Sequence, residues 1–434
     1  MTTPHPRPTA HAPVRRAVPV AVAARARRSR AAATSLAVLA LCLGLWSATP
    51  AAAQQDDDTE TTSPGERAPT RGPVDTTATT RAEEHLDLLG DLVRGVPLVQ
   101  GDFADPYALS EPEAIYVYAT NTVHANVPVL ELPKGEDVDA RYLGDALPEL
   151  PSWTVKGFQW APAVWARPDG TFVLYYVTPS SGAPGNRGCI SRATSDDPAG
   201  PFTDDSTSAF ICPLELGGAI DPSVVVDDDG TPYLLWKSDG NCCDLPTVLH
   251  SQRLSRDGLS VAGDAVPLVH ATQSWEGDLV EAPSMVRRGD THYLFYSAND
   301  WDSTDYAIGV AECESIQGPC HKPSDEPWMH SSPYSLGPGG EEFFQPPGST
   351  DIWMVHHGWL PHQAGTTDGE RRLYLDRVSF HGGDTLPSRS NDEAVAEALV
   401  EDTAFLALLV GLGVGLVLVV GVLVGRRRTR RASD

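Results

Sequence analysis

Apolar segments separated by polar turns recur along the chain at nearly constant spacing. Four copies align on Pro106, Pro162, Pro222 and Pro283, so successive copies are 56, 60 and 61 residues apart. Each proline stands at the start of an apolar segment, where a β-strand tolerates the missing N–H. A polar turn and an aromatic-rich return segment follow, which is the pattern of a β-hairpin. The repeat therefore predicts a β-structure built from equivalent hairpin units.

A fifth, weaker copy begins near Gly337 and contains the apolar run 352–356. Units of roughly 60 residues suit a four-stranded blade with its loops. The sequence therefore predicts an all-β domain, a five-bladed β-propeller over residues 96–385. We expect residues 377–380 to close the ring with the strand before Asp102. A β-sandwich is the alternative, but the regular period argues against it.

Residues 1–53 have the pattern of a secretory signal peptide. They contain seven Arg and no Lys, Asp or Glu, and an apolar run over 36–46 precedes the small residues 51–53. This order of basic, apolar and small residues predicts cleavage before Gln54. An upstream error in the start site would account for the long basic part, and a twin-arginine signal is a weaker alternative. Residues 54–95 have the composition of a linker.

The C-terminal part carries a second membrane signal. Residues 404–424 are 21 residues without a charge, enough to span about 30 Å of hydrocarbon at about 1.5 Å per residue. Five Arg follow within residues 425–434, and the positive-inside rule predicts that this basic tail is cytoplasmic. A buried core helix is the alternative. We therefore expect a linker over 386–403, a transmembrane helix, and a propeller displayed outside the cell surface.

The charge of the chain changes the expected partner. The chain has 32 Lys+Arg and 58 Asp+Glu, a net charge of −26, which argues against a protein that binds nucleic acid. Without the twelve Arg at the two ends and Asp434, 20 basic and 57 acidic residues remain, a net charge of −37 for the exported part. The expected partner is therefore a neutral polysaccharide or oligosaccharide. Nothing in the sequence indicates more than a monomer.

The cysteines fit an exported protein. Cys42 lies in the predicted signal peptide, and an even count of six remains, which predicts three disulfides. The most economical pairs are 189–212 and 313–320. Cys242 and Cys243 then form a vicinal bond or pair elsewhere. The spacing matches no structural zinc site, and we expect no metal and no cofactor.

Acidic residues recur at the starts of the repeats. Asp105, Asp221 and Glu281 stand at or next to the repeat prolines. The first strand of each propeller blade lines the central channel, so these three carboxyl groups should converge there and raise at least one pKa. Such a set suits glycoside hydrolysis. The alternative for each is a structural Asp-Pro turn, and we interpret Asp227-Asp228-Asp229-Gly230 as a hairpin turn, not a calcium loop.

Taken together and in order, these motifs resemble glycoside hydrolase family 43, in the five-bladed-propeller clan that also includes the β-fructosidases. The resemblance covers about 96–385. Its motifs are Gly101-Asp102-Phe103-Ala104-Asp105-Pro106, Trp160-Ala161-Pro162, Ile220-Asp221-Pro222 with Asp228-Asp229-Gly230-Thr231-Pro232-Tyr233-Leu234, and Glu281-Ala282-Pro283 with Tyr293-Leu294-Phe295-Tyr296-Ser297.

The resemblance implies a role for each acidic residue. Asp105 would be the general base that activates a water, and Glu281 the general acid that protonates the leaving oxygen. Asp221 would orient the acid and raise its pKa. The family inverts the anomeric carbon, so base and acid should lie about 6.5–9.5 Å apart.

The resemblance also implies a sugar-binding wall and one departure from the family pattern. Trp160 and Trp301 would stack on sugars, and Arg372 would be the arginine that the last blade often supplies. Trp165 and Trp236 lie inside strands and are expected in the core. Many members have His, linked to a central ion or water cluster, where this chain has Gly340; His356 or His357 could substitute.

The predicted function is an extracellular, membrane-anchored glycosidase that cleaves arabinofuranose- or xylose-containing polysaccharides with inversion. Two alternatives stay open. A non-catalytic carbohydrate-binding propeller would bind glycans without forming product, and a fructan-active clan relative would turn over sucrose or levan. Sugar, linkage and exo or endo action depend on loops whose sequence does not decide them.

Overall fold

The structure is a computed structural model and describes residues 97–133, 140–180, 187–366, 369–381 and 386–389. The predicted signal peptide, both linkers apart from a few residues, the transmembrane helix and the basic tail lie outside these residues. Within the described part, no helix is long and apolar enough to cross a membrane.

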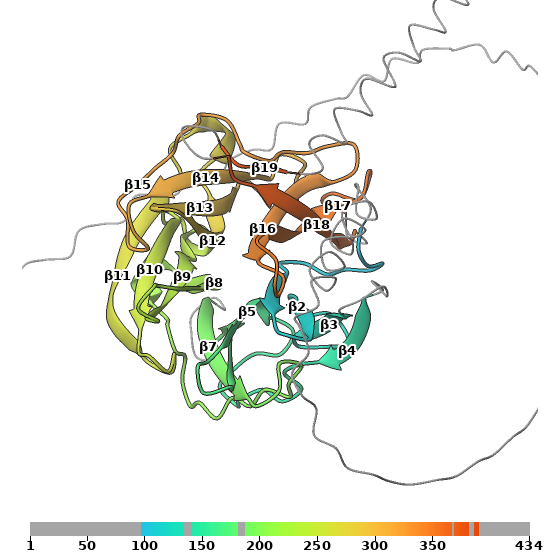
Figure 1. The fold of residues 1–434 in the computed structure, drawn as a ribbon, viewed down its shortest axis with the longest axis vertical. Coiled ribbons are helices and arrows are strands. Elements are labelled where there is room, and N and C mark those ends of the chain that lie inside the picture. The colour runs from blue at the N-terminus through green and yellow to red at the C-terminus, as the bar shows by residue number, and fades with distance from the viewer. Residues whose placement is uncertain (1–96, 134–139, 181–186, 367–368, 382–385, 390–434) are drawn as a thin grey trace, which may run out of the picture. The chain divides into compact units, whose positions relative to one another are not determined.

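The described residues form five antiparallel sheets around a central axis, which confirms the all-β five-bladed propeller (Figure 1). Blade 1 contains β1 (Tyr107–Ser110), β2 (Ala114–Tyr118), β3 (Pro128–Pro133) and β4 (Arg141–Asp145). Blade 2 contains β5 (Trp160–Ala166), β6 (Phe172–Pro179) and β7 (Gly188–Ser195). Blade 3 contains β8 (Ala219–Val226), β9 (Pro232–Ser238), β10 (Val248–Leu254) and β11 (Val261–His270).

Blade 4 contains β12 (Val280–Arg288), β13 (Thr291–Ala298), β14 (Ala307–Cys313) and β15 (Cys320–His321). Blade 5 contains β16 (Leu336–Phe344), β17 (Ile352–Trp359), β18 (Arg371–Ser379) and β19 (Ser388–Arg389). Short 3₁₀ turns are η2 (Leu214–Leu216), η3 (Gly240–Cys243) and η4 (Ser274–Glu276). In every blade the first strand along the chain is the innermost one, so the chain runs outward from the axis five times.

The ring closes between blades 5 and 1, but not at the residues that the sequence indicated. The N–H groups of Leu98 and Phe103 donate to the carbonyls of Leu373 (2.7 Å) and Arg371 (2.8 Å), at the beginning of β18. Residues 377–379 instead belong to the later part of β18, which pairs with β17 and β19. The physical reason is packing, because Leu98 and Phe103 enter the apolar cluster that contains Leu373.

The hydrophobic core is divided into five clusters, one at each interface between neighbouring blades. Successive residues of a strand point to opposite faces, and in the inner strands both faces are apolar. On β6, Leu174 packs against blade 1 and Tyr175 against blade 3, so the blade packs on both of its neighbours. The expectation that Trp165 and Trp236 belong to the core is confirmed, since both are buried between blades 2 and 3.

A repeated backbone distortion marks the innermost strands. Five equivalent residues have left-handed φ angles: Asp105 (49°), Ala161 (41°), Asp221 (53°), Ala282 (48°) and Gly340 (60°). Register shifts accompany them in β5, β8, β12 and β16, as in β-bulges. A bulge re-aims a side chain out of the regular alternation of a strand. The repeat prolines therefore follow positions whose backbone is bent at the axis.

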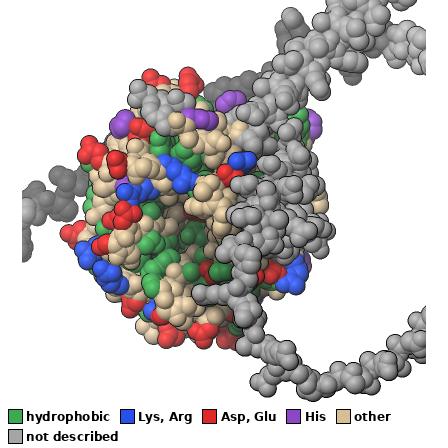
Figure 2. Space-filling model, viewed as in Figure 1, with side chains coloured by type: hydrophobic (Ala, Val, Ile, Leu, Met, Phe, Trp, Pro, Cys, Tyr) green, Lys and Arg blue, Asp and Glu red, His purple; other side chains and the backbone are tan. Residues whose placement is uncertain are grey.

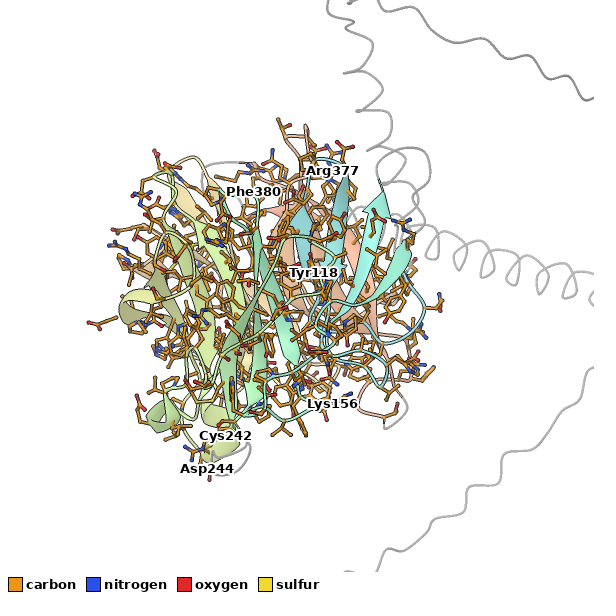
Figure 3. All side chains as sticks on the ribbon, turned by 90° about the horizontal axis from the view of Figure 1, so that it is seen from below. Tyr118, Lys156, Cys242, Asp244, Arg377 and Phe380 are labelled. Carbon is orange, nitrogen blue, oxygen red and sulfur yellow. A yellow bond between two sulfur atoms is a disulfide. The ribbon has the colours of Figure 1, made fainter. Side chains whose placement is uncertain are left out.

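Three disulfides join the six cysteines of the described region, and the pairs 189–212 and 313–320 are confirmed. Cys242 and Cys243 bond to each other, which decides between the two options left by the sequence. Figure 3 shows Cys242 and Asp244 on the same face of the propeller as Lys156, with Arg377 and Phe380 on the opposite face. Acidic side chains are spread around the propeller rim in Figure 2, and hydrophobic ones border its central hollow.

Candidate active site

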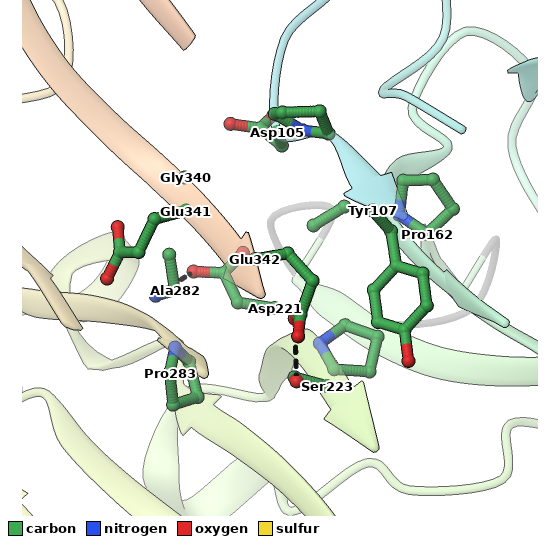
Figure 4. A pocket seen from close by; sticks show the side chains of 13 residues that line it. Asp105, Tyr107, Pro162, Asp221, Ser223, Ala282, Pro283, Gly340, Glu341 and Glu342 are labelled. Carbon is green, nitrogen blue, oxygen red and sulfur yellow. Dashed lines mark hydrogen bonds between the residues drawn. The ribbon is translucent and has the colours of Figure 1, made fainter. Parts of the chain in front are cut away.

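A pocket lies on the propeller axis and is lined by the innermost strands of all five blades (Figure 4). It is lined by Asp105, Pro106, Tyr107, Ala161, Pro162, Asp221, Pro222, Ser223, Ala282, Pro283, Gly340, Glu341 and Glu342. Glu281 directly precedes the lining residue Ala282 and acts electrostatically on Asp221, as does Asp105. The structure thus brings the three predicted carboxyl groups together.

Asp105 is held by three residues. Its Oδ2 accepts the Thr120 hydroxyl at 2.5 Å, and its Oδ1 lies 3.0 Å from the Arg371 guanidinium. Its own N–H donates to Nδ1 of His357 at 3.1 Å. The Thr120 hydroxyl also accepts the N–H of Ala161 at 3.0 Å, so it ties blade 1 to blade 2. Asp105 nevertheless keeps 23% of its side chain exposed.

Both oxygens of the Glu281 carboxyl group accept hydrogen bonds. Lys237 Nζ donates to its Oε2 at 2.7 Å, and the Tyr306 hydroxyl donates to its Oε1 at 2.8 Å. The Lys237 side chain is fully buried. Burial alone would lower the pKa of Lys237, but Glu281 and Asp221 outweigh this effect and raise it.

Asp221 has a different environment. Its Oδ2 accepts the N–H of Ala282 at 2.9 Å. Burial, followed by the neighbouring Glu281, raises the pKa of Asp221 to about 7, although Lys237 acts in the opposite direction. The expectation that convergence raises at least one carboxyl pKa therefore agrees with the site, and the affected group is Asp221.

The two tryptophans predicted to bind sugars are both partly exposed. Trp301 is 44% exposed, and the guanidinium of Arg371 lies 4.7 Å from its ring centroid. Trp301 also stacks on Trp359, with ring centroids 6.2 Å apart. Trp160 begins β5, is partly exposed, and meets Phe158 edge-on at 5.7 Å. Both tryptophans thus keep surface that a ligand could contact.

Arg372 is placed away from the three carboxyl groups. Its guanidinium contacts Gln100 at 3.2 Å and Glu370 at 2.5 Å. The preceding residue, Arg371, is the arginine that reaches Asp105. Successive residues of a strand point to opposite faces, so neighbours on β18 have different surroundings.

Sequence reasoning missed Lys237, Tyr306, Thr120 and Arg371. Lys237 carried a usable signal, because it ends an apolar run in a predicted strand, and lysine is almost never buried without a partner. Tyr306, in the segment between β13 and β14, and Thr120, in the segment after β2, have no repeat-equivalent signal.

The space that a histidine side chain at position 340 would need is already filled. A Cβ atom at Gly340 would lie 2.6 Å from His357 Nδ1, so the His357 ring already occupies the space of such a side chain. His357 Nδ1 accepts the Asp105 N–H, whereas its Nε2 is buried and has no hydrogen-bond partner among the described residues. Within the described ranges, His, Cys, Asp and Glu form no group of three or more that could hold a metal ion.

The Glu342 carboxyl group also lines the axial pocket. Glu342 accepts the hydroxyls of Ser223 and Ser284, each at 2.8 Å, and so connects blade 5 with blades 3 and 4. Figure 4 shows the bond from Ser223. Burial raises the pKa of Glu342 to about 7.

Comparison with known proteins extends these observations. An extracellular exo-α-(1→5)-L-arabinofuranosidase from Cellvibrio japonicus is 26% identical over 51% of this chain and 66% of its own length. An extracellular endo-α-(1→5)-L-arabinanase from Bacillus subtilis is 26% identical over 52% of this chain and 67% of its own length. The chain therefore spans about two thirds of each of these relatives.

Solved structures share the fold. A thermostable family-43 glycoside hydrolase superimposes with a TM-score of 0.57 at 26% identity, over 68% of this chain and 95% of that chain. An endo-1,4-β-xylanase from Bacteroides thetaiotaomicron gives a TM-score of 0.56 at 25% identity, over 67% and 94% of the two chains. The family model described as glycosyl hydrolases family 43 matches residues 95–386, almost the predicted 96–385. Since that match covers the whole propeller and most of the chain, this protein belongs to glycoside hydrolase family 43.

Proposed function

We propose that this glycoside hydrolase cleaves arabinofuranose-containing polysaccharides, with xylose-containing polymers as the second substrate class, and inverts the anomeric carbon. The observation that carries the proposal is the convergence of Asp105, Asp221 and Glu281 on one axial pocket in three different environments. Carboxyl groups whose environments separate their proton affinities are the usual acid and base of a glycosidase.

Asp105 is the proposed general base. It is partly exposed, and Arg371 and Thr120 fix both of its oxygens without closing it off from solvent. In the proposed step, a water oxygen attacks the anomeric carbon while Asp105 accepts one proton of that water.

Glu281 is the proposed general acid. It donates its proton to the glycosidic oxygen as the bond from that oxygen to the anomeric carbon breaks. One water is consumed, and exchange with solvent then removes the proton from Asp105 and returns one to Glu281. Asp221, which acts electrostatically on this pair, is the proposed group that adjusts the protonation of the acid.

Trp301 is the proposed wall of the substrate site. Its ring is nearly half exposed and is held in place by Trp359 and Arg371. Because Arg371 contacts both Trp301 and Asp105, a sugar stacked on the ring would lie beside the base. Trp160 is the proposed second wall, on blade 2.

Arabinose polymers are preferred because the named activities of the two sequence relatives are an arabinofuranosidase and an arabinanase. The xylanase among the structural relatives supports xylose polymers as the second class. We also propose that residues 404–424 anchor the enzyme at the cell surface, on the sequence argument alone.

The test is hydrolysis by the purified full chain in detergent. Arabinan, arabinoxylan and nitrophenyl α-L-arabinofuranoside should release sugar, and NMR should show the inverted anomer first. The Glu281→Gln variant should lose this activity on the polymers. Binding to insoluble glycans without any product would favour a carbohydrate-binding propeller, and turnover of sucrose or levan would favour a fructan-active enzyme.

A further inference from the structure

Lys237 is a buried cation that the acid and base roles above do not use. It lies on β9, its side chain is 0% exposed, and it pairs in register with Ile220, the residue before Asp221. Its ammonium group contacts Glu281 on the neighbouring blade. An apolar side chain at this position would pack without the cost of burying a charge. The position of the ammonium group at the active site therefore suggests a function for it.

The donors around Glu281 indicate its charge state. One oxygen accepts from the ammonium group of Lys237 and the other from the hydroxyl of Tyr306. A carboxylate accepts at both oxygens, and a hydrogen bond from a cation to a carboxylate is about twice as strong as a neutral one. The substrate-free arrangement is therefore complementary to an ionised Glu281.

Asp221 is the opposite case. Its hydrogen-bond donor is the Ala282 N–H, and it is placed in the field of Glu281 and Asp105. Two neighbouring carboxyl groups in a shielded site titrate as a pair and hold one proton between them over a wide pH range. The group with fewer donors is the favoured position of that proton.

We propose that Lys237 is a positioning residue for the acid: its ammonium group holds Glu281 as a carboxylate in the free site, so that the proton shared by the two carboxyl groups rests on Asp221. The other charged or titratable groups around them are Tyr306, Asp239, Asp300, Asp105 and Glu341, which lines the same pocket. The catalytic consequence of this inference rests on the proposed function, in which Glu281 is the general acid. The shared proton passes from Asp221 to Glu281 before Glu281 protonates the leaving oxygen, and the pair neither gains nor loses charge in that transfer.

The first test is the pH profile of kcat/KM for Lys237→Met and Lys237→Gln. Removing the cation makes both carboxyl groups hold protons to higher pH. The basic side of the profile should therefore move up by about one pH unit or more. The loss of activity should be greater for polysaccharide than for a nitrophenyl glycoside, whose leaving group needs little protonation. An equal loss on both substrates with an unmoved profile would overturn the proposal, because a structural lysine would act in that way.

The matched control is Lys322→Met. Lys322 also pairs with a buried glutamate, Glu276 on η4, with an Nζ–Oε1 distance of 2.5 Å. Its loss should lower the melting temperature and leave the pH profile of kcat/KM unchanged. A shift of the profile in this variant as well would mean that the effect is not specific to Lys237.

A second test needs neither turnover nor a folded Lys237 variant. Infrared difference spectra across neutral pH report protonated carboxyl groups directly. The wild-type spectrum should contain a titrating carboxylic acid that disappears in Asp221→Asn, while bands of Glu341 and Glu342 cancel in the comparison. Survival of that band in Asp221→Asn with its disappearance in Glu281→Gln would overturn the proposal. Since this readout is independent of hydrolysis, its failure is distinguishable from failure of the proposed function.

Discussion

The propeller contains two buried lysine–glutamate pairs of nearly the same composition, one on the axis and one in blade 4. Lys237 and Tyr306 donate to Glu281 on the axis, and Lys322 and Tyr296 donate to Glu276 beside η4. Both glutamates are buried, with exposures of 8% and 0%. In addition, Glu276 accepts two backbone N–H groups, from Thr272 at 2.7 Å and from Gln273 at 2.8 Å.

The two glutamates differ in how many hydrogen-bond donors surround their carboxyl groups. Burial alone would raise the pKa of Glu276, but Lys322, the Thr272 amide and Tyr296 together lower it below its ordinary value. Glu281 has two donors, and its neighbour Asp221 is an acid that takes up a proton near neutral pH. The four donors around Glu276 favour its ionised form. Glu281 has two donors and a second carboxyl group, Asp221, beside it, so a proton can be exchanged between the two.

The largest effect should come from Glu281→Gln on the axis. Loss of the proposed general acid should lower kcat on arabinan by about 10²–10⁴-fold, the usual contribution of such a group. The change also leaves the buried Lys237 without its hydrogen-bonded anion, so stability should fall as well, and kcat is compared at equal amounts of folded protein. Activity on a nitrophenyl glycoside should fall much less. A variant that hydrolyses arabinan at the wild-type rate would contradict the assignment of the acid.

Glu276→Gln should lower stability without lowering kcat. It leaves Lys322 without its charged partner, and breaking a buried pair in this way costs about 3–5 kcal/mol of unfolding free energy. Denaturant unfolding should show this loss, while the folded fraction keeps the wild-type kcat. If kcat fell together with stability, the two pairs would not be separable in function.

The free energy of unfolding should depend on pH in opposite directions for Glu276 and for Asp221. Glu276 has a lowered pKa in the folded state, so its contribution is present above the unfolded value of 4.5 and is lost as the pH falls further. Asp221 has a raised pKa, from 3.8 to about 7, so the folded state keeps a proton that the unfolded chain releases, and stability declines as the pH rises between these values.

The measurement compares Asp221→Asn with wild type by denaturant unfolding at several pH values. The variant should gain stability relative to wild type as the pH rises from 3.8 to about 7, by at most about 4 kcal/mol at 1.36 kcal/mol per pH unit. Below that range the difference between the two proteins should be constant. A constant difference across the whole range would contradict the raised pKa.

The smallest effect distinguishes two adjacent arginines. Arg371→Met removes the cation beside Asp105, and loss of a hydrogen bond to a charged group costs about 1.5–3 kcal/mol, or roughly 10–150-fold in kcat/KM. Arg372→Met removes contacts to Gln100 and Glu370 and should change kcat/KM by less than about threefold. Equal losses of kcat/KM would restore Arg372 as a binding residue.

The repeat made the fold and the three carboxyl groups predictable. A period near 60 residues requires equivalent units, and equivalent positions in a propeller meet at the axis, so Asp105, Asp221 and Glu281 could be grouped without knowing any contact. The order of the innermost strands and the cores between blades follow from the same period.

The partners of those groups could not be found in this way. Lys237 lies on a second strand and Tyr306 in an inter-strand segment, so neither has an equivalent in the other blades that would mark it. The choice between Arg371 and Arg372 depends on which face of β18 each residue occupies, and a shift of one residue in register exchanges the two faces. The closure of the ring at residues 98–103 likewise depends on packing that no local pattern specifies.

The five left-handed positions on the innermost strands have a consequence for how such an enzyme can change. Each blade presents one bent residue to the axis, and in this chain two of these residues are Asp, two are Ala and one is Gly. The backbone that aims them is supplied by the blade and not by the side chain, because alanine adopts it as well as aspartate. New chemistry at Ala161 or Ala282 is therefore one substitution away, with no new loop and no change of fold. The ring thus preserves a geometry for functional groups that it does not yet contain, which makes the architecture a starting point for engineering as much as a finished active site.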